Sequence, residues 1–187
     1  MATRVLIVGL GNLTHPLTRH SVGQLAVDSL STRLGVRLSL NKSIGGYFSE
    51  TTLDIHGKPF IIGLYKTSAP MNLSGPPVGI ALRKTARSPS SLIVLHDSLE
   101  HKPTTLSPKF GGSANGHNGV RSLISALGTK DFYRLRLGIG KPESDVAGHV
   151  LARLPNFENQ FWAPDGPGLD LLWEQIQNIA IHVDRAS

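Results

Sequence analysis

Two short, unbroken apolar runs set the strongest limit on how this chain can fold. The runs are RVLIVGL at residues 4–10 and SLIVLHD at residues 91–97. Each has the length and the β-branched content of a strand that is buried on both faces, as the strands of parallel sheets are. After the first run, apolar residues from Val22 to Leu30 recur at helical spacing, and Gly35 follows as a stop signal. Alternating strand and helix predict an α/β fold.

The rest of the 187-residue chain continues this pattern. Residues 47–55, 59–66, 104–110 and 132–140 are strand-like, and residues 75–86, 118–128, 145–155 and 168–183 are helical. The turn HGK makes a hairpin of the first two strands, and Pro108 confines the third to a sheet edge. In the fourth, Arg134 and Arg136 alternate with apolar residues, which predicts one core face and one wet face. We expect a single domain over residues 1–187, with a mixed twisted β-sheet surrounded by helices.

Charge is distributed unevenly along the chain, whose net charge is +6. Residues 1–141 hold 17 basic and 6 acidic side chains, whereas residues 142–187 hold 2 basic and 7 acidic ones. A basic body predicts a polyanionic partner, nucleic acid above all. The alternative is a solvated basic surface that only keeps the protein soluble. Because the chain has no cysteine, disulfides, thiolate nucleophiles and cysteine-based zinc sites are excluded.

The sequence also bears on location. No apolar stretch approaches the roughly 20 residues that a membrane-spanning helix needs. The first strand begins by Arg4, which leaves no room for a signal or transit peptide before it. We therefore expect a cytoplasmic protein that does not contact membranes.

The loop after the first apolar run resembles a nucleotide-binding loop only in part. Gly9 and Gly11 fit the dinucleotide fingerprint, but Thr14 occupies its third glycine position, and the expected second strand at residues 36–40 ends without an acidic residue. No Gly-Lys-Ser/Thr follows for a P-loop. What remains is a sharp turn that presents Asn12, with His20 at the start of the first helix. This is the edge where open α/β sheets bind ligands.

Three further stretches expose polar side chains in loops or at strand ends. Asn72 precedes a helix, Asp97 ends the second apolar run, and His117 and Asn118 lie in GGSANGHNG. Singly, such residues are usually helix caps or turns. Together with His20 they supply a base, a carboxylate that orients it, and neutral amides, with no recognisable nucleophile. The set favours hydrolysis by an activated water.

Three alternatives remain open from the residues alone. A non-catalytic RNA-binding module would explain the basic charge, but not the pairing of a histidine with a carboxylate. A metal site at His96, Asp97 and His101 matches no standard ligand spacing. A nicotinamide-dependent enzyme would need the fingerprint that the first loop lacks.

The segments VGLGN, TRH, MNLSG, LHD, GGSANGHNG and YRLRLGIG occur in this order between residues 4 and 155. Jointly they resemble the bacterial-type peptidyl-tRNA hydrolase family. The resemblance implies cleavage of the ester between a peptide and the 3′ ribose of tRNA, which recycles tRNA, without a metal or cofactor. It also implies a monomer whose partner is the acceptor stem and 3′ end of peptidyl-tRNA.

The resemblance assigns roles to residues at matching positions. The catalytic residues that it implies are Asn12, His20, Asp97 and Asn118. The substrate-binding residues that it implies are Met71, Asn72, Lys109, His117 and Arg136. Within these sets His20 is the general base, Asp97 orients it, and the asparagines position substrate. Met71 would pack beside the peptide, and Lys109 with Arg136 would grip the terminal phosphate of the tRNA.

Some positions depart from the family pattern. Asn12 is followed by Leu-Thr-His-Pro where Pro-Gly is usual, Ser21 replaces a common Asn, and Ser98 replaces the usual Glu. The departures predict a divergent member of the family. If the protein is eukaryotic, a mitochondrial location is the alternative to a cytoplasmic one.

Overall fold

The two apolar runs form β1 (Thr3–Gly9) and β5 (Leu92–Ser98), which pair in parallel near the centre of a seven-stranded sheet. The computed structural model describes residues 2–186. Its other strands are β2 (Ser39–Asn41), β3 (Gly46–Ile55), β4 (Lys58–Thr67), β6 (Leu106–Phe110) and β7 (Tyr133–Gly138). The strand order is β2-β3-β4-β1-β5-β7-β6. The four neighbouring strands β4, β1, β5 and β7 run parallel to one another. The expectation of a single domain with a mixed sheet is confirmed.

Antiparallel strands flank the parallel ones. β3 and β4 form the predicted hairpin, which turns at His56 and Gly57, both with positive φ. β6 is the edge strand that Pro108 predicts, and it pairs with β7 alone among the strands of residues 2–186. The strand expected at residues 36–40 is shorter and later, because only Ser39–Asn41 pairs with β3.

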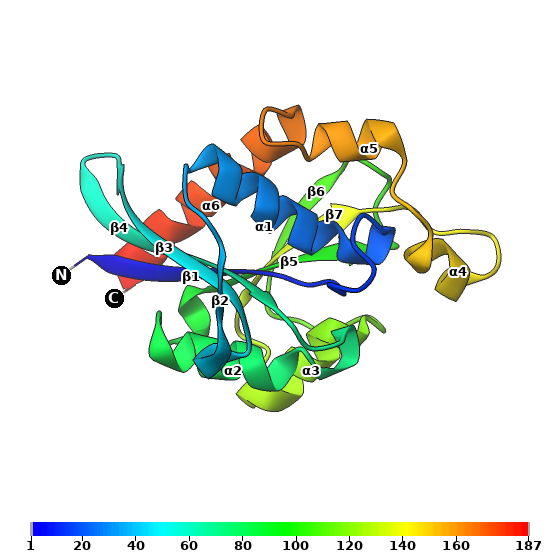
Figure 1. Ribbon diagram of the computed structural model, residues 1–187. Coiled ribbons are helices and arrows are strands. Elements are labelled where there is room, and N and C mark those ends of the chain that lie inside the picture. Colours follow the sequence, from blue (N-terminus) through cyan, green and yellow to red (C-terminus); the bar gives the residue numbers. More distant parts are fainter. Residues whose placement is uncertain (1, 187) are drawn as a thin grey trace.

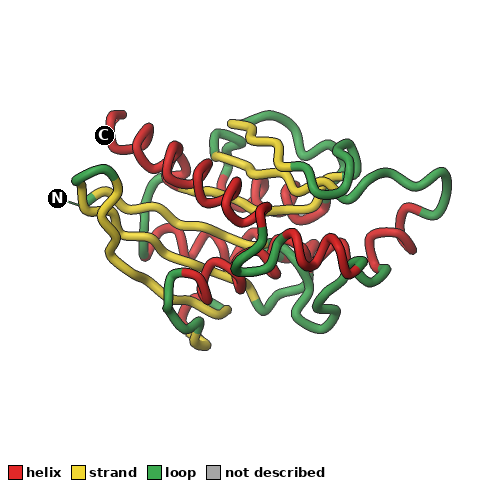
Figure 2. The backbone as a smooth tube through the Cα atoms, turned by 90° about the horizontal axis from the view of Figure 1, so that it is seen from above, coloured by secondary structure: helices red, strands yellow, loops and turns green. Residues whose placement is uncertain are grey.

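Helices cover both faces of the sheet (Figure 1). α1 (Val22–Arg33), α5 (Asn156–Phe161) and α6 (Pro167–Ala186) lie on one side, and α2 (Gly75–Lys84) and α3 (Asn118–Leu127) lie on the other. α4 (Val146–Leu151) lies at the end of the molecule remote from the termini, as the view from above also shows (Figure 2). Short 3-10 turns are η1 (Arg19–Ser21), η2 (Lys42–Ile44), η3 (Met71–Leu73) and η4 (Pro89–Ser91).

The two layers of helices explain why the central strands are apolar throughout. Ile7 and Leu95 pack into the core on the α1 and α6 side, while Val8 and Val94 pack into the core on the α2 and α3 side. Successive residues of β1 and β5 therefore both face a core, as expected of parallel strands between helices. Within residues 2–186, no helix is long and apolar enough to cross a membrane.

Two expectations need correction. The helix expected over residues 145–155 is only α4, because Arg153 leaves the helix to form an antiparallel bridge with Thr18. The wet face expected of β7 is also wrong at Arg134, which is 2% exposed. The glycine-rich loop of residues 111–117 explains this burial, since Arg134 Nη2 donates a hydrogen bond to the carbonyl of Gly111 at 2.5 Å. An alternating pattern identifies the two faces of a strand, but it does not reveal a loop that covers one of them.

Candidate active site

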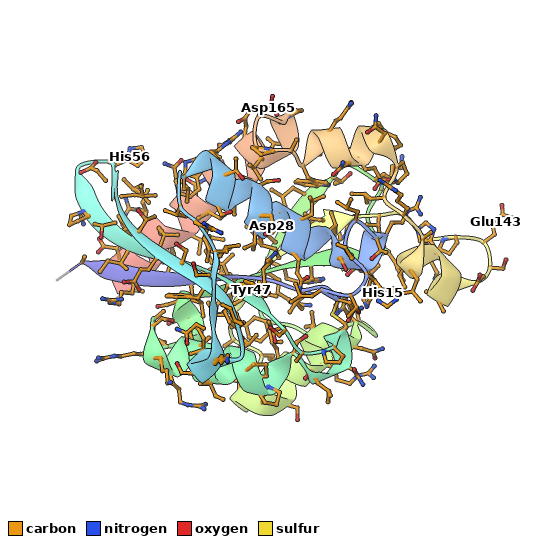
Figure 3. All side chains as sticks on the ribbon, in the orientation of Figure 1. His15, Asp28, Tyr47, His56, Glu143 and Asp165 are labelled. Atoms are coloured by element: carbon orange, nitrogen blue, oxygen red, sulfur yellow. The ribbon has the colours of Figure 1, made fainter. Side chains whose placement is uncertain are left out.

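A cavity of about 630 Å³ lies at the carboxyl ends of β5 and β7. β5 contributes His96, Asp97 and Ser98 to its lining, and the glycine-rich loop contributes His117. His20 and α4 complete much of the wall. Figure 3 places His15, in the loop after β1, near α4, whereas His56 lies at the opposite end of the molecule. The site therefore occupies the sheet edge where open α/β folds bind ligands.

Asp97 is the centre of this site. Its side chain is 3% exposed and stands two residues beyond the last residue of β5 that pairs with β1. His20 Nδ1 lies 3.0 Å from both carboxylate oxygens, and His117 Nε2 lies 2.8 Å from Oδ1. Burial alone would raise the pKa of Asp97, but the electrostatic interactions and hydrogen bonds with His117 and His20 hold it well below its usual range. Asp97 is therefore a carboxylate that accepts hydrogen bonds from two imidazoles.

His20 is held by the turn η1, directly before α1. Its Nδ1 must donate to Asp97, because an ionised carboxylate can only accept. This leaves Nε2 as the basic nitrogen of the ring. Burial opposes the charged form of His20, but the hydrogen bond and the negative charge of Asp97 outweigh it and raise the pKa above the ordinary value of 6.5. The arrangement gives a base with a fixed tautomer and a strengthened proton affinity.

His117 has a different task, which its hydrogen bonds define. It is the N-cap of α3, where its Nδ1 accepts the backbone N–H of Val120 at 3.2 Å. A backbone N–H can only donate, so Nδ1 is unprotonated and Nε2 carries the hydrogen that points to Asp97. The sequence left open whether Asn118 caps this helix. In the structure Asn118 is the first helical residue of α3, and the imidazole of His117 is the cap.

The same tautomer bears on metal binding. Within residues 2–186, one group of histidine and acidic side chains is close enough to share a metal ion, namely His20, Asp97 and His117, whose ligand atoms lie within 4.8 Å of one another. This group differs from the His96, Asp97 and His101 set considered from sequence. A metal ligand needs a free lone pair. His117 Nε2 has none while Nδ1 caps α3, so the hydrogen-bonded arrangement suits these residues better than metal ligation.

Asn12 lies in the loop between β1 and η1, and its amide orientation is fixed. Oδ1 accepts the backbone N–H of Met71 at 2.8 Å, so the amino group of the side chain remains free to donate. Ser21 Oγ holds the loop itself, since it accepts the Asn12 backbone N–H at 3.0 Å and donates to the His15 carbonyl at 2.9 Å. The hydroxyl of Ser21 thus links the two ends of the loop that carries Asn12 and leads to His20.

The other residues implied for peptide binding are spread over neighbouring surfaces. Asn118 is exposed and lines both the main cavity and a second hollow of about 420 Å³, where Asn72 lies. Arg121 Nη1 donates to Asn118 Oδ1 at 3.3 Å, which again leaves the amino group free to donate. Met71 is buried in the core between β1, α2 and α3. Its contact with a peptide remains a prediction.

The two residues implied for phosphate binding lie on adjacent strands. Arg136 lines the cavity, and its Nη2 donates to Ser107 Oγ at 2.7 Å. Lys109 on β6 lies opposite Arg134 on β7, two pairs along the ladder from Ser107 and Arg136. Residues opposite each other, or two apart, share a sheet face. Lys109 and Arg136 are therefore on the same face and within reach of one anionic group.

Sequence reasoning missed two cationic residues of this wall. Arg134 and Lys141 line the cavity beside Arg136. The alternation of β7 could have found Arg134, because it places Arg134 and Arg136 on one face. No comparable signal marked Lys141, which precedes α4 in a loop. The apolar part of the wall, from Val146 and Val150 of α4, depends on how this loop folds back.

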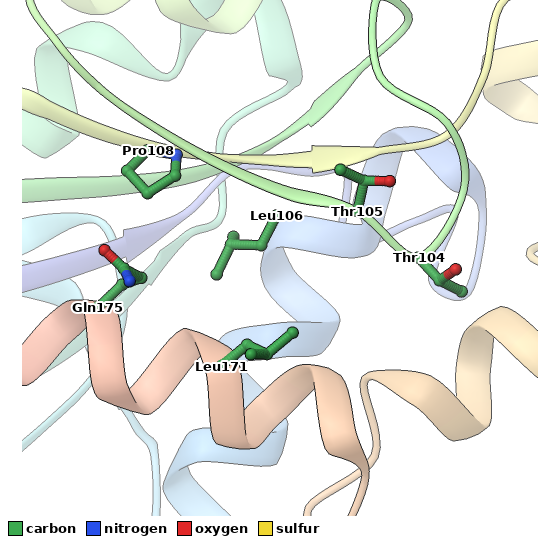
Figure 4. Close-up of a pocket in the computed structure, with 6 residues that line it drawn as sticks. All are labelled: Thr104, Thr105, Leu106, Pro108, Leu171 and Gln175. Carbon is green, nitrogen blue, oxygen red and sulfur yellow. The ribbon is translucent and has the colours of Figure 1, made fainter.

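A further hollow, of about 300 Å³, lies between β6 and α6 (Figure 4). Thr104, Thr105, Leu106, Pro108, Leu171 and Gln175 line it. None of these side chains titrates between pH 4 and 10. It offers no acid or base, and it contains none of the candidate catalytic residues.

Comparison with known proteins identifies the family. The family model described as peptidyl-tRNA hydrolase matches residues 6–166. Peptidyl-tRNA hydrolase of Rhodococcus jostii (strain RHA1) is 39% identical over 159 residues, covering 83% of this chain and 82% of the relative. That of Nocardia farcinica (strain IFM 10152) is 42% identical over 150 residues, covering 78% and 76%.

Solved structures agree with the sequences. A crystal structure of peptidyl-tRNA hydrolase in complex with n-propanol has a TM-score of 0.82 at 30% identity, and the match covers 100% of this chain and 93% of that one. For the enzyme of Acinetobacter baumannii the TM-score is 0.77 at 29% identity, covering 96% and 95%.

The fold and the site define an α/β enzyme whose cavity holds a carboxylate-bound histidine at the carboxyl ends of parallel strands. The chain belongs to the peptidyl-tRNA hydrolase family, in its bacterial form. It is a hydrolase of peptidyl-tRNA that acts in translation, as the sequence predicted.

Proposed function

We propose that this hydrolase uses His20 as the general base that activates water for attack on the ester of peptidyl-tRNA. One observation carries the proposal. His20 Nδ1 lies 3.0 Å from both oxygens of the buried Asp97 carboxylate, in the wall of the cavity. A histidine held in this way has one free basic nitrogen, and it gains stabilisation when it becomes protonated.

The reaction then proceeds in two steps. A water molecule transfers a proton to His20 Nε2 as its oxygen attacks the ester carbonyl carbon. The carbonyl π electrons move to oxygen and form a tetrahedral oxyanion. When this intermediate collapses, the bond to the ribose oxygen breaks, and the leaving oxygen takes the proton from His20. Because the ribose oxygen of an ester leaves more readily than the nitrogen of an amide, no acyl-enzyme is needed.

The asparagines have a supporting role in this proposal. Asn12 and Asn118 each have the carbonyl oxygen of the side chain engaged, by Met71 N–H and by Arg121 respectively. Their amino groups can therefore donate to the peptide carbonyl and to the developing oxyanion. With Asn72, they would bind main-chain groups that every peptide shares, which suits an enzyme acting on peptides of any sequence.

We infer further that Lys109 and Arg136 bind the terminal phosphate of the acceptor stem, with the 3′ end directed into the cavity. Their shared sheet face supports this arrangement. We also propose that the enzyme is a monomer, and size-exclusion chromatography with light scattering checks that state. We place the reaction in the cytoplasm, where bacterial ribosomes release peptidyl-tRNA.

Replacement of His20 tests the proposed base. In a buffer with EDTA, His20→Ala should hydrolyse a labelled N-blocked aminoacyl-tRNA about 10²-fold or more slowly, while binding deacylated tRNA with unchanged affinity. His15→Ala is the matched control, because its side chain lies in the loop just before the turn of His20 and, within residues 2–186, is hydrogen-bonded to Thr14 alone. Near-normal turnover by His20→Ala would assign the base elsewhere. A wild-type protein that binds tRNA without turnover would support the RNA-binding alternative.

A further inference from the structure

His96 is a buried histidine that the proposed reaction does not use. It is 3% exposed and precedes Asp97 on β5. Its ring packs edge-on against His117, with 4.8 Å between the ring centroids. His96 Nε2 is buried without a hydrogen-bond partner among the described residues. Although His96 borders the cavity, so little of it is exposed that we expect its contribution to the reaction to be indirect.

The end of the sheet explains what His96 contacts. β1 pairs with β5 only as far as Leu95, whose carbonyl accepts the N–H of Leu10 at 2.9 Å. Alternate carbonyls of a strand point to the same side. The carbonyl of Asp97 therefore points to the side of β1 as well, at a level that β1 no longer reaches. His96 Nδ1 lies 2.7 Å from this oxygen. Its N–H thus replaces the backbone N–H that β1 would supply if the strand continued.

The protonation of His96 follows from the same contact. A carbonyl can only accept, so the hydrogen of the neutral ring is on Nδ1. Burial above all, together with electrostatic interactions with His117 and Arg134, lowers the pKa of His96 to about 3, although its hydrogen bond to Asp97 opposes them. His96 is thus a neutral donor whose proton stays on one nitrogen throughout the pH range in which the enzyme works.

We propose that His96 is a positioning residue of the hydrolase, which holds the main chain of Asp97 so that its carboxylate meets both His20 and His117. The carboxylate must accept bonds from two rings at 2.8 to 3.0 Å, and the last pairing with β1 lies two residues before it. A displacement of the Asp97 main chain would move its Cβ and break one of these bonds. The inference rests on the proposed role of Asp97 in orienting the base.

Two variants of nearly equal shape separate this role from simple filling of space. Asn can place an amide nitrogen close to the position of Nδ1, whereas Leu has the same outline and no donor. His96→Leu should lower kcat by about 10- to 100-fold with KM within about twofold, because a carboxylate displaced by a fraction of an ångström supports the base poorly. Its acid limb of kcat against pH should move to lower pH, because His20 loses support for its charge. His96→Asn should stay within about threefold of wild type, with the limb unmoved.

The comparison can fail in clear ways. Equal losses in both variants would make His96 a space-filling residue, and wild-type turnover in both would remove it from the reaction altogether. Circular dichroism and melting temperature establish that each variant is folded. Should His96→Leu not fold, imidazole ¹⁵N spectra of the wild-type protein provide the test. They should show an Nδ1-protonated His96 from pH 5 to 8, and an Nε2-protonated or titrating ring would overturn the proposal.

Failure of the proposed function itself would look different. In that case Asp97→Asn and His20→Ala would keep their turnover, whatever His96→Leu does. If those two variants lose turnover while His96→Leu retains it, the positioning role alone is wrong.

Discussion

One carboxylate gives two histidines different chemistry. Asp97 accepts a hydrogen bond from both His20 and His117. The second nitrogen of His117 is used to cap α3, whereas the second nitrogen of His20 is free. The partner of the second nitrogen therefore decides which ring can act as a base. Residue type alone does not contain this information, and the sequence accordingly placed His117 only in the pocket.

The pH dependence of turnover should report on Asp97. A base must be unprotonated, so wild-type activity should fall as the pH drops through the pKa of His20, which lies above 6.5. In Asp97→Asn the burial of His20 remains, but the support of the carboxylate is lost, so this acid limb should move to lower pH. The plateau should drop by about 10²- to 10⁴-fold, because an amide does not stabilise the imidazolium.

Rates of kcat/KM from pH 5 to 9 provide the measurement. Asp28→Asn is the control, since Asp28 lies on α1, where Figure 3 shows it, and pairs with Lys66 outside the cavity. Its profile should match that of the wild type. A folded Asp97→Asn variant with the wild-type limb would show that Asp97 does not act through His20.

At the scale of elements, the sequence predicted those whose burial pattern is continuous. β1, β5, the hairpin and α3 lie where expected, because each has a complete apolar pattern and its own turn signals. The helix that became α4 was predicted too long and α5 was not predicted, since helices of six residues depend on tertiary contacts for their limits. Polar residues at strand ends could be expected to gather at one edge. The part of the cavity wall that α4 forms could not be predicted, because its position depends on the bridge between Arg153 and Thr18, which are far apart in the sequence.

The cap of α4 should control the affinity for substrate. Asp145 has φ 52° and accepts the N–H of Gly148 at 2.9 Å, at the start of a helix that lines the cavity. Asp145→Ala should cost this helix about 1 kcal/mol. We expect faster hydrogen exchange in residues 146–151 and a KM for peptidyl-tRNA raised severalfold, with kcat less affected. Asn caps helices equally well and tolerates a positive φ.

Asp145→Asn is therefore the matched variant, and it should behave as wild type in both exchange and kinetics. Exchange measured by mass spectrometry, alongside steady-state rates, checks both. Faster exchange without any change in KM would show that α4 does not contact the substrate.

Across the whole molecule, the charges divide into a basic body and an acidic C-terminal part. Three cations, Arg134, Arg136 and Lys141, line the cavity, and none of them pairs with a carboxylate of residues 2–186. The pairs that do form include Arg33 with Asp170 and Lys58 with Asp184, which join the body to α6. The acidic segment thus neutralises the body away from the cavity and leaves the cavity positive.

The salt dependence of binding should reveal the phosphate contact. Arg136→Ala should raise KM for peptidyl-tRNA, leave kcat less affected, and reduce the slope of log K against log salt by roughly 1. Removal of the 5′ phosphate from the tRNA should have the same effect on the wild type and add little in the variant. Lys58→Ala, at the hairpin end of the molecule, is the control with an unchanged slope. Full additivity of the mutation and the missing phosphate would place the contact at another residue.

The proposed catalytic pair is joined only by the overall topology, since His20 and Asp97 are 77 residues apart in the sequence. β1, which precedes the turn of His20, must pair with β5, which carries Asp97; β7 must then add to β5, and α6 must cover β1 and α1. Such non-local pairings form late, and domains fold as units. During synthesis every protein is attached to tRNA by the very ester that this enzyme cleaves. A nascent copy of the enzyme can therefore cut this bond only after these non-local pairings have brought His20 and Asp97 together.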